Sequence, residues 1–261
     1  MDKTTIKDLL EPARANALLA SLGQSQTFET GDALPPFFHQ IFFWEAQRPD
    51  TLGRDGHPRV GGLIPDMGLP RRMWAGGHLQ FHAPLRLGSV AEKTTEVVRA
   101  TRKIGRSGPL GFVTLRHDIS QAGQLCVTEH QDLIYREDNT APVTPPTAEA
   151  PAEDVVAVTF DTTLLFRYSA LTFNGHRIHY DLDYAKSVEG YDNLVVHGPL
   201  LGQLLMLHAE DALGPLGSFS FRATSALTLG RSAQLCRSGA TLWVESEGRQ
   251  LHMTAEAKPK T

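Results

Sequence analysis

The chain has 261 residues, of which 41% are hydrophobic and 21% are charged, so it can form one large core or two smaller domains. Its formal net charge of −4 argues against a broad nucleic-acid surface, and no apolar run approaches the roughly 20 residues that a transmembrane helix needs. The only cysteines, Cys126 and Cys236, exclude a disulfide scaffold, and the N-terminus lacks an apolar signal region, so we expect a cytoplasmic protein without nucleic-acid or membrane partners.

The first part of the chain predicts two apolar elements followed by loops. Residues 6–22 have apolar side chains at helical spacing, and Gly23 then favours the end of a helix. Residues 37–44 follow two prolines and are rich in aromatic side chains. This segment is compatible with a buried helix or with a short buried strand. Residues 48–78 carry glycine or proline every few positions and predict loops.

From Leu79 onward the pattern alternates between apolar and polar residues, which predicts an antiparallel meander. It contains stretches such as LGFVTLRHDIS and QLCVTEHQDLIYRE, separated by glycines. Residues 139–154 are rich in proline and poor in large apolar side chains, which is typical of a linker. We therefore expect an N-terminal lobe at 1–138 and a C-terminal lobe at 155–261.

The second half predicts a helix among several strands. Residues 199–213 carry leucines at helical spacing, and Gly214 followed by proline ends the pattern. A polar loop is expected at 174–180. The expected strand-like segments are 155–160, 163–168, 218–228, 241–246 and 250–256.

Residues 166–205 concentrate the side chains that could carry chemistry. They include His176, His179, His197, Asp181 and Asp183, with His208 just beyond. Gly198 opens the expected helix, where free backbone N–H groups and the helix dipole can polarise a carbonyl oxygen. The pattern His176, His179 and Asp181 could also suggest a metal site. We expect none, because the loop has no HExxH arrangement and no fixed helical face.

The order of these residues resembles the motif of the MaoC-like, type 2 enoyl-CoA hydratases. Their pattern is Thr/Ser-Gly-Asp-x-Asn-Pro-Leu/Ile-His, followed by a helix that begins at His-Gly. This chain reads TFNGHRIH at 172–179 and His-Gly at 197–198. The segment PDMGLPRRMWAGGHLQFHAPLRLG is similar to the two-lobed subgroup that contains mesaconyl-C4-CoA and itaconyl-CoA hydratases, with an N-terminal lobe of the fatty-acid-synthase dehydratase type. The resemblance implies an α+β double hot-dog fold, in which two antiparallel sheets each wrap around a central helix.

The resemblance also implies roles for particular residues. His179 would be the acid/base, and the amide of Gly198 would bind the thioester oxygen. Asn174 stands where the family has Asp, and it can hold a water but cannot accept a proton. A carboxylate on the substrate would explain this change, because Asp would repel it and Arg177 could pair with it. Further candidate contacts to substrate or coenzyme A are His176, Tyr180, His197, Arg106 and Arg231.

These residues predict a hydro-lyase that converts itaconyl-CoA or mesaconyl-C4-CoA to citramalyl-CoA. Coenzyme A enters as part of the substrate, and no separate cofactor is expected. The alternatives are a 3-hydroxyacyl-carrier-protein dehydratase, a non-catalytic acyl-CoA-binding protein and a thioesterase, since one fold supports several activities. The first lobe lacks a second Asn–His pair, so we expect one active site, with that lobe helping to form the acyl and coenzyme A pocket. The protein could act as a homodimer.

Overall fold

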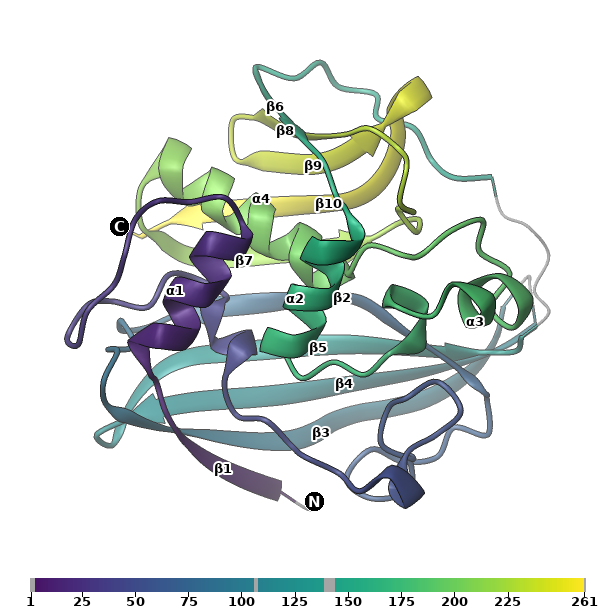
Figure 1. Ribbon diagram of the computed structural model, residues 1–261, viewed down its shortest axis with the longest axis horizontal. Coiled ribbons are helices and arrows are strands. Elements are labelled where there is room, and N and C mark those ends of the chain that lie inside the picture. The colour runs from purple at the N-terminus through teal and green to yellow at the C-terminus, as the bar shows by residue number, and fades with distance from the viewer. Residues whose placement is uncertain (1–2, 106–107, 139–143, 261) are drawn as a thin grey trace.

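A computed structural model describes residues 3–105, 108–138 and 144–260 of the chain. Ten strands form one antiparallel sheet in the order β1-β3-β4-β5-β2-β7-β10-β9-β8-β6 (Figure 1). The strands are β1 (Lys3–Leu9), β2 (Arg71–Phe81), β3 (Val90–Gly105), β4 (Gly108–Gln121), β5 (Gln124–Arg136), β6 (Asp154–Val158), β7 (Leu216–Ala223), β8 (Ala233–Ser238), β9 (Thr241–Ser246) and β10 (Gln250–Pro259). The helices are α1 (Pro12–Ser21), α2 (Thr162–Leu171), α3 (Leu182–Ser187) and α4 (Gly198–Leu213).

The sheet consists of two halves, β1 to β5 and β6 to β10, which are joined where β2 pairs with β7. Two glycines of β2 lie at this junction. A Cβ at Gly76 would lie 2.5 Å from the carbonyl oxygen of Phe221, and one at Gly77 would lie 2.7 Å from that of His130. Real side chains do not tolerate such distances, so the glycines allow the two halves to form one continuous sheet.

Helix α4 supplies the core of the second half. It packs against β7, β9 and β10, and its buried residues include Leu200, Leu201, Leu205 and Met206. The helix expected at 199–213 is therefore confirmed, with its start one residue earlier. The meander of the first half is confirmed as well, because β3, β4 and β5 pair in succession.

The aromatic segment 37–44 is buried except at its end, where Trp44 is exposed, and it forms neither an α-helix nor a strand. Only a 3₁₀ turn forms, at Phe38–Ile41. Phe37 and Phe43 on either side have φ angles of 69° and 61°, in the left-handed region, so an α-helix cannot continue through either of them. In Figure 1, the short helices α1 and α2 lie side by side in front of the sheet, and they contact each other.

The prediction of a helix at 6–22 was wrong for the residues before Pro12. Residues Lys3–Leu9 form the edge strand β1 and pair with β3, and Pro12 then occupies the first turn of α1. The threonines and isoleucine of this segment favour a strand, and proline suits the start of a helix because its missing N–H has no intrahelical partner there.

Three other expectations also need correction. The strand predicted at 163–168 is part of α2, because the carboxylate of Asp161 accepts a hydrogen bond from the Leu164 amide and caps a helix. The loop predicted at 48–78 ends earlier, since β2 begins at Arg71. Strand β8 was not predicted at all.

Part of the expected linker, residues 139–143, lies outside the described residues. The following residues pack on the second half of the sheet, since the Ala148 amide donates to the carbonyl of Arg249 at 2.9 Å and the Leu251 amide to that of Pro146 at 2.8 Å. The division into lobes at 138 and 155 stays a prediction. Within the described ranges, no helix is both long and apolar enough to cross a membrane.

Candidate active site

A cavity of about 790 Å³ lies between the two halves of the chain. The first half contributes the loop before β2, together with parts of β2 and β5, and the second half contributes α2, the 172–180 segment and the start of α4. Asn174, His179 and Gly198 all line this cavity. The three residues predicted to be catalytic therefore meet in one place.

His179 is held as a neutral base at the end of a 3₁₀ turn, Arg177–His179. Its Nδ1 lies 2.7 Å from the carbonyl oxygen of Val195, which can only accept a hydrogen bond, so Nδ1 carries the proton. Nε2 then keeps its lone pair, and no described residue donates to it. Burial first, and then the nearby His197 and His176, lower the pKa of His179 well below 6.5. At neutral pH the ring can accept a proton.

His197 packs against the ring of His179. The two rings stack with centroids 3.6 Å apart, and Nε2 of His197 lies 2.8 Å from the hydroxyl of Ser169. Burial lowers the pKa of His197 to about 3, so it adds no positive charge beside His179. His197 is fully buried and is not among the cavity-lining residues. Its contact with His179 therefore points to a positioning role.

Asn174 lines the cavity with a side-chain amide. Its Oδ1 accepts a hydrogen bond from the His176 amide at 3.0 Å, and its backbone N–H donates to the carbonyl of Ser169 at 2.8 Å. Its Nδ2 has no acceptor among the described residues, so this N–H donor is available to a water molecule or a substrate oxygen.

Phe173 is another departure from the family pattern, which has glycine at this position. Its φ of 51° lies in the left-handed region that glycine adopts without strain. The Phe173 ring stacks on Trp44, with centroids 5.4 Å apart, and the indole N–H of Trp44 donates to the carbonyl of Leu171. We infer that this packing offsets the backbone strain of about 1–3 kcal/mol that such a conformation costs.

Gly198 is the first residue of α4, and its N–H has no partner within the helix. Pro199 follows and has no N–H of its own, so the Gly198 amide is the first free donor at this helix end. A Cβ at Gly198 would lie 2.6 Å from the Trp74 ring. Glycine thus allows the helix end to sit directly against β2, at the wall of the cavity.

These pKa shifts predict how catalysis depends on pH. Because the active form of His179 is neutral and its pKa is lowered, the acid limb of kcat/KM should lie below pH 6.5. Steady-state rates followed at the absorbance of the enoyl thioester test this, and an acid limb at or above pH 6.5 would contradict it.

The same shifts affect stability, so each pH needs a control for folding. Unfolded histidines take up protons near pH 6.5, whereas His57 and His197 have folded-state pKa values of about 4 and about 3. The free energy of unfolding should therefore be highest above pH 6.5 and decrease as the pH falls toward those values. Circular dichroism at each pH separates loss of fold from loss of catalysis.

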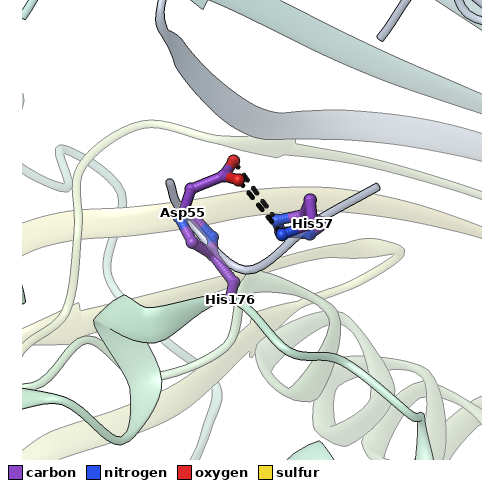
Figure 2. A group of neighbouring side chains, drawn as sticks. All are labelled: Asp55, His57 and His176. Atoms are coloured by element: carbon purple, nitrogen blue, oxygen red, sulfur yellow. Dashed lines mark hydrogen bonds and ion pairs between the residues drawn. The ribbon is translucent and has the colours of Figure 1, made fainter. Parts of the chain in front are cut away.

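The first half contributes a histidine that the sequence analysis missed. Figure 2 shows Asp55 and His57 beside His176. The His57 amide donates to one oxygen of Asp55 at 3.0 Å, and its Nδ1 lies 3.4 Å from the other. The rings of His57 and His176 lie 4.7 Å apart. The only signal in the sequence was GRDGHPRVGG, read as a loop, because nothing in it indicates contact with residues 174–177.

Backbone contacts hold this loop against the motif segment. The Arg177 amide donates to the carbonyl of Asp55 at 2.9 Å. Gly56, with φ 88°, packs so closely that a Cβ would lie 2.0 Å from the carbonyl oxygen of Gly175. No side chain other than hydrogen fits there, so glycine is needed to bring His57 to the cavity wall.

Asp55, His57 and His176 are also the described residues that could together bind a metal ion, with ligand atoms within 4.8 Å of one another. His57 already contacts both oxygens of Asp55, which we interpret as an aspartate–histidine pair. The pattern His176, His179 and Asp181 does not gather around one point. Asp181 instead caps α3 through the Tyr184 amide and pairs with Arg177.

Arg177 does not line the cavity. Its guanidinium binds Asp181 at 2.7 Å and lies over the ring of Tyr184. Its role as partner of a substrate carboxylate gains no support from this position. Tyr180 lines the cavity, where it is half exposed and donates to the carbonyl of Gly175.

The other predicted contacts are placed as follows. His176 lines the cavity, and its Nε2 lies 4.0 Å from Glu189. Arg231 pairs with Asp192 at 2.8 Å outside the cavity, so its contact with coenzyme A stays a prediction. Arg106 lies outside the described residues.

A neutral histidine, a carboxamide donor and a free helix amide thus line the same cavity. Water addition to an acyl thioester needs a base for the water, a group that holds it, and a donor for the negative oxygen that develops on the thioester. The fold and site together define a hydro-lyase of the hydratase/dehydratase type.

Comparison with known proteins identifies the family. The profile of the hydroxyacyl-thioester dehydratase type 2 family matches residues 37–229. The chain is 45% identical to the mesaconyl-C(4)-CoA hydratase of Chloroflexus aurantiacus, over 85% of this chain and 81% of that protein. It is 29% identical to the mitochondrial hydroxyacyl-thioester dehydratase type 2 of Schizosaccharomyces pombe, over 93% of each chain. This chain belongs to the hydroxyacyl-thioester dehydratase type 2 family.

Solved structures confirm the fold. HtdX of Mycobacterium tuberculosis matches with a TM-score of 0.72 at 16% identity, over 99% of this chain and 100% of that one. A conserved M. tuberculosis protein described as a double hotdog fold matches with a TM-score of 0.58 at 16% identity, over 98% of this chain and 95% of that one. The double hot-dog fold expected from the motif is therefore confirmed, although the two expected sheets are joined into one continuous sheet through the β2–β7 pairing.

Proposed function

We propose that this hydratase acts on a short, branched dicarboxylic enoyl-CoA, with mesaconyl-C4-CoA or itaconyl-CoA as substrate and citramalyl-CoA as product. The proposal rests on one observation, which is that neutral His179, Asn174 and Gly198 line the same cavity. The 45% identity to a mesaconyl-C(4)-CoA hydratase supports the choice of acyl group.

His179 acts on the attacking water. Nδ2 of Asn174 donates a hydrogen bond to the water oxygen, and Nε2 of His179 accepts one of its protons. The water oxygen forms a bond to C3 while the C2–C3 double bond shifts its electron pair toward the thioester. The imidazolium then returns its proton to C2. One water is added, and His179 regains its neutral form.

The Gly198 amide stabilises the negative charge that develops on the thioester oxygen. It is a free donor at the positive end of the α4 dipole, in a partly enclosed site where such a contact is strong. One donor of this kind is worth about 2.7–4 kcal/mol in transition-state stabilisation.

The presence of asparagine at position 174 supports a substrate with its own carboxylate. An aspartate there would add a negative charge beside the reacting carbons, and two like charges in a poorly solvated site repel each other strongly. Asparagine keeps the hydrogen bond to water without this charge. His179 remains as the proton acceptor.

A second candidate is dehydration of longer 3-hydroxyacyl thioesters, the reaction named in the description of the family and of the fungal relative. The cavity favours it in one respect. Its volume of about 790 Å³ and its apolar lining residues, among them Trp74, Phe166 and Leu201, leave room for more than a five-carbon acyl group.

A substrate panel distinguishes these functions. We expect kcat/KM for mesaconyl-C4-CoA to exceed that for crotonyl-CoA, and that for a ten-carbon 2-enoyl-CoA, by about tenfold or more. Chromatography of the product identifies citramalyl-CoA. A clear preference for crotonyl-CoA or for the long chain would overturn the proposed substrate, and release of free thiol would indicate a thioesterase.

The cellular location and the partners of the protein stay predictions from the sequence. We propose that the protein works in the cytoplasm on free acyl-CoA, without nucleic-acid or membrane partners. Pairing into a homodimer is a separate expectation, which light scattering of the purified protein can test.

A further inference from the structure

Arg72 is the one arginine or lysine among the cavity-lining residues in the described part of the chain. It lies near the start of β2, directly after Arg71. Consecutive residues of a strand point to opposite sides, and the two arginines differ accordingly. Arg71 is buried, forms an ion pair with Glu189 and lies over the ring of Tyr191. Its charge is thus neutralised within the protein.

The guanidinium of Arg72 has no such partner. No described carboxylate lies within 4 Å of it, and no described residue accepts a hydrogen bond from its side chain. Other arginines near the site are paired, Arg177 with Asp181 and Arg231 with Asp192. An arginine stays charged at neutral pH, and a half-buried cation in a largely apolar cavity favours the binding of an anion.

The neighbours of Arg72 leave its charge uncancelled. His57 is near enough for the charge of Arg72 to help lower its pKa, after burial, to about 4, so His57 is neutral. The Asp55 carboxylate forms no ion pair with Arg72, and His57 contacts both of its oxygens. Glu45, the one acidic residue lining the cavity in the described ranges, is exposed.

We propose that Arg72 binds the second carboxylate of the substrate and so selects dicarboxylic over monocarboxylic enoyl-CoA. The inference rests on the proposed function and names the residue that carries its substrate choice. A guanidinium matches the two oxygens of a carboxylate with two parallel hydrogen bonds. Ring contacts run from His57, which feels the charge of Arg72, to His176 and on to His179, and all four residues line the same cavity.

The phosphates of coenzyme A carry the same anionic oxygens, so the experiment must separate the two sources. Arg72→Gln removes the charge and keeps a polar side chain of moderate length. Arg177→Gln is the matched control, because it removes the guanidinium that the sequence favoured. Kinetics with mesaconyl-C4-CoA and crotonyl-CoA are measured for both variants and for the wild type.

For Arg72→Gln we expect the ratio of kcat/KM for mesaconyl-C4-CoA to kcat/KM for crotonyl-CoA to fall about 100-fold. The change should appear mainly in the KM for mesaconyl-C4-CoA, because losing one partner of a desolvated charge pair is costly. Arg72→Lys should fall between wild type and Arg72→Gln, because lysine lacks the bidentate geometry. Arg177→Gln should keep the wild-type ratio. A retained ratio in Arg72→Gln, or a ratio lost in Arg177→Gln, overturns the proposal.

Binding of unreactive analogues gives a readout that does not need turnover. Succinyl-CoA carries a second carboxylate and butyryl-CoA does not, and calorimetry with both should show that Arg72→Gln loses the preference for succinyl-CoA. Equal loss for both analogues, with weaker binding of free coenzyme A, would assign Arg72 to the phosphates and overturn the proposal. If the wild-type enzyme prefers neither mesaconyl-C4-CoA over crotonyl-CoA nor succinyl-CoA over butyryl-CoA, the proposed function itself is wrong.

Discussion

Replacing His179 by alanine should lower kcat for hydration by about 1,000-fold or more, within the range that general acid–base groups contribute. The ring lines the cavity with a free nitrogen lone pair, and the hydrogen bond from its Nδ1 to the Val195 carbonyl fixes its tautomer. Without it, water must attack without a base, and C2 loses its proton donor. Single-turnover rates followed at the enoyl-thioester absorbance measure the loss.

The control is His208→Ala, which removes another histidine at the far part of α4, away from the cavity lining. It should keep most of the wild-type kcat. Added imidazole should restore part of the activity of His179→Ala by entering the space left behind, and thermal unfolding should confirm that this variant folds. A His179→Ala enzyme that keeps more than a few per cent of wild-type activity would disprove the assignment.

The second large effect is expected for Gly198→Ala. The added methyl would lie 2.6 Å from a ring atom of Trp74, and that ring is held by stacking on Phe221 with centroids 4.8 Å apart. The start of α4 must then move away from β2, and with it the amide that faces the thioester oxygen. We expect kcat to fall about 100-fold, since loss of one such donor costs that much.

A matched control exists one turn further along the same helix. Gly202 also faces Trp74, but a Cβ there would lie 3.6 Å away, an ordinary contact. Gly202→Ala should therefore change kcat by less than about threefold and should stabilise the helix slightly. The double variant Gly198→Ala, Trp74→Leu should recover part of the lost rate. Wild-type kcat in Gly198→Ala would exclude the amide as a catalytic donor.

Much of the candidate active site was predictable from the sequence because it is local in the chain. Asn174 and His179 lie on one short segment, and Gly198 begins the next long helix, so motif and helix signals together indicate their roles. The role predicted for Arg177 gains no such support. Its spacing to Asp181 is that of an i, i+4 pair, and the two side chains bind each other.

The fold was predicted best where the elements are long. Strands β3, β4 and β5 have 13 to 16 residues each, and their alternation is sustained. Short segments were misassigned where one local interaction decided the outcome. Examples are the Asp161 cap that makes α2 a helix, and the left-handed Phe37 and Phe43, which limit the segment 37–44 to a single 3₁₀ turn.

The sequence by itself predicted the fold family and the candidate residues for the water-adding chemistry, because both depend on periodicity and on spacing within short segments. Only the tertiary structure revealed the part of the cavity lining that comes from the first half of the chain, where His57 and Arg72 lie. These residues are more than 100 positions before His179 in the chain. The close backbone packing of Gly56 on Gly175 and the β2–β7 pairing bring them to the cavity that His179 also lines. No local pattern records such long-range contacts, since they arise only when the two halves of the sheet join.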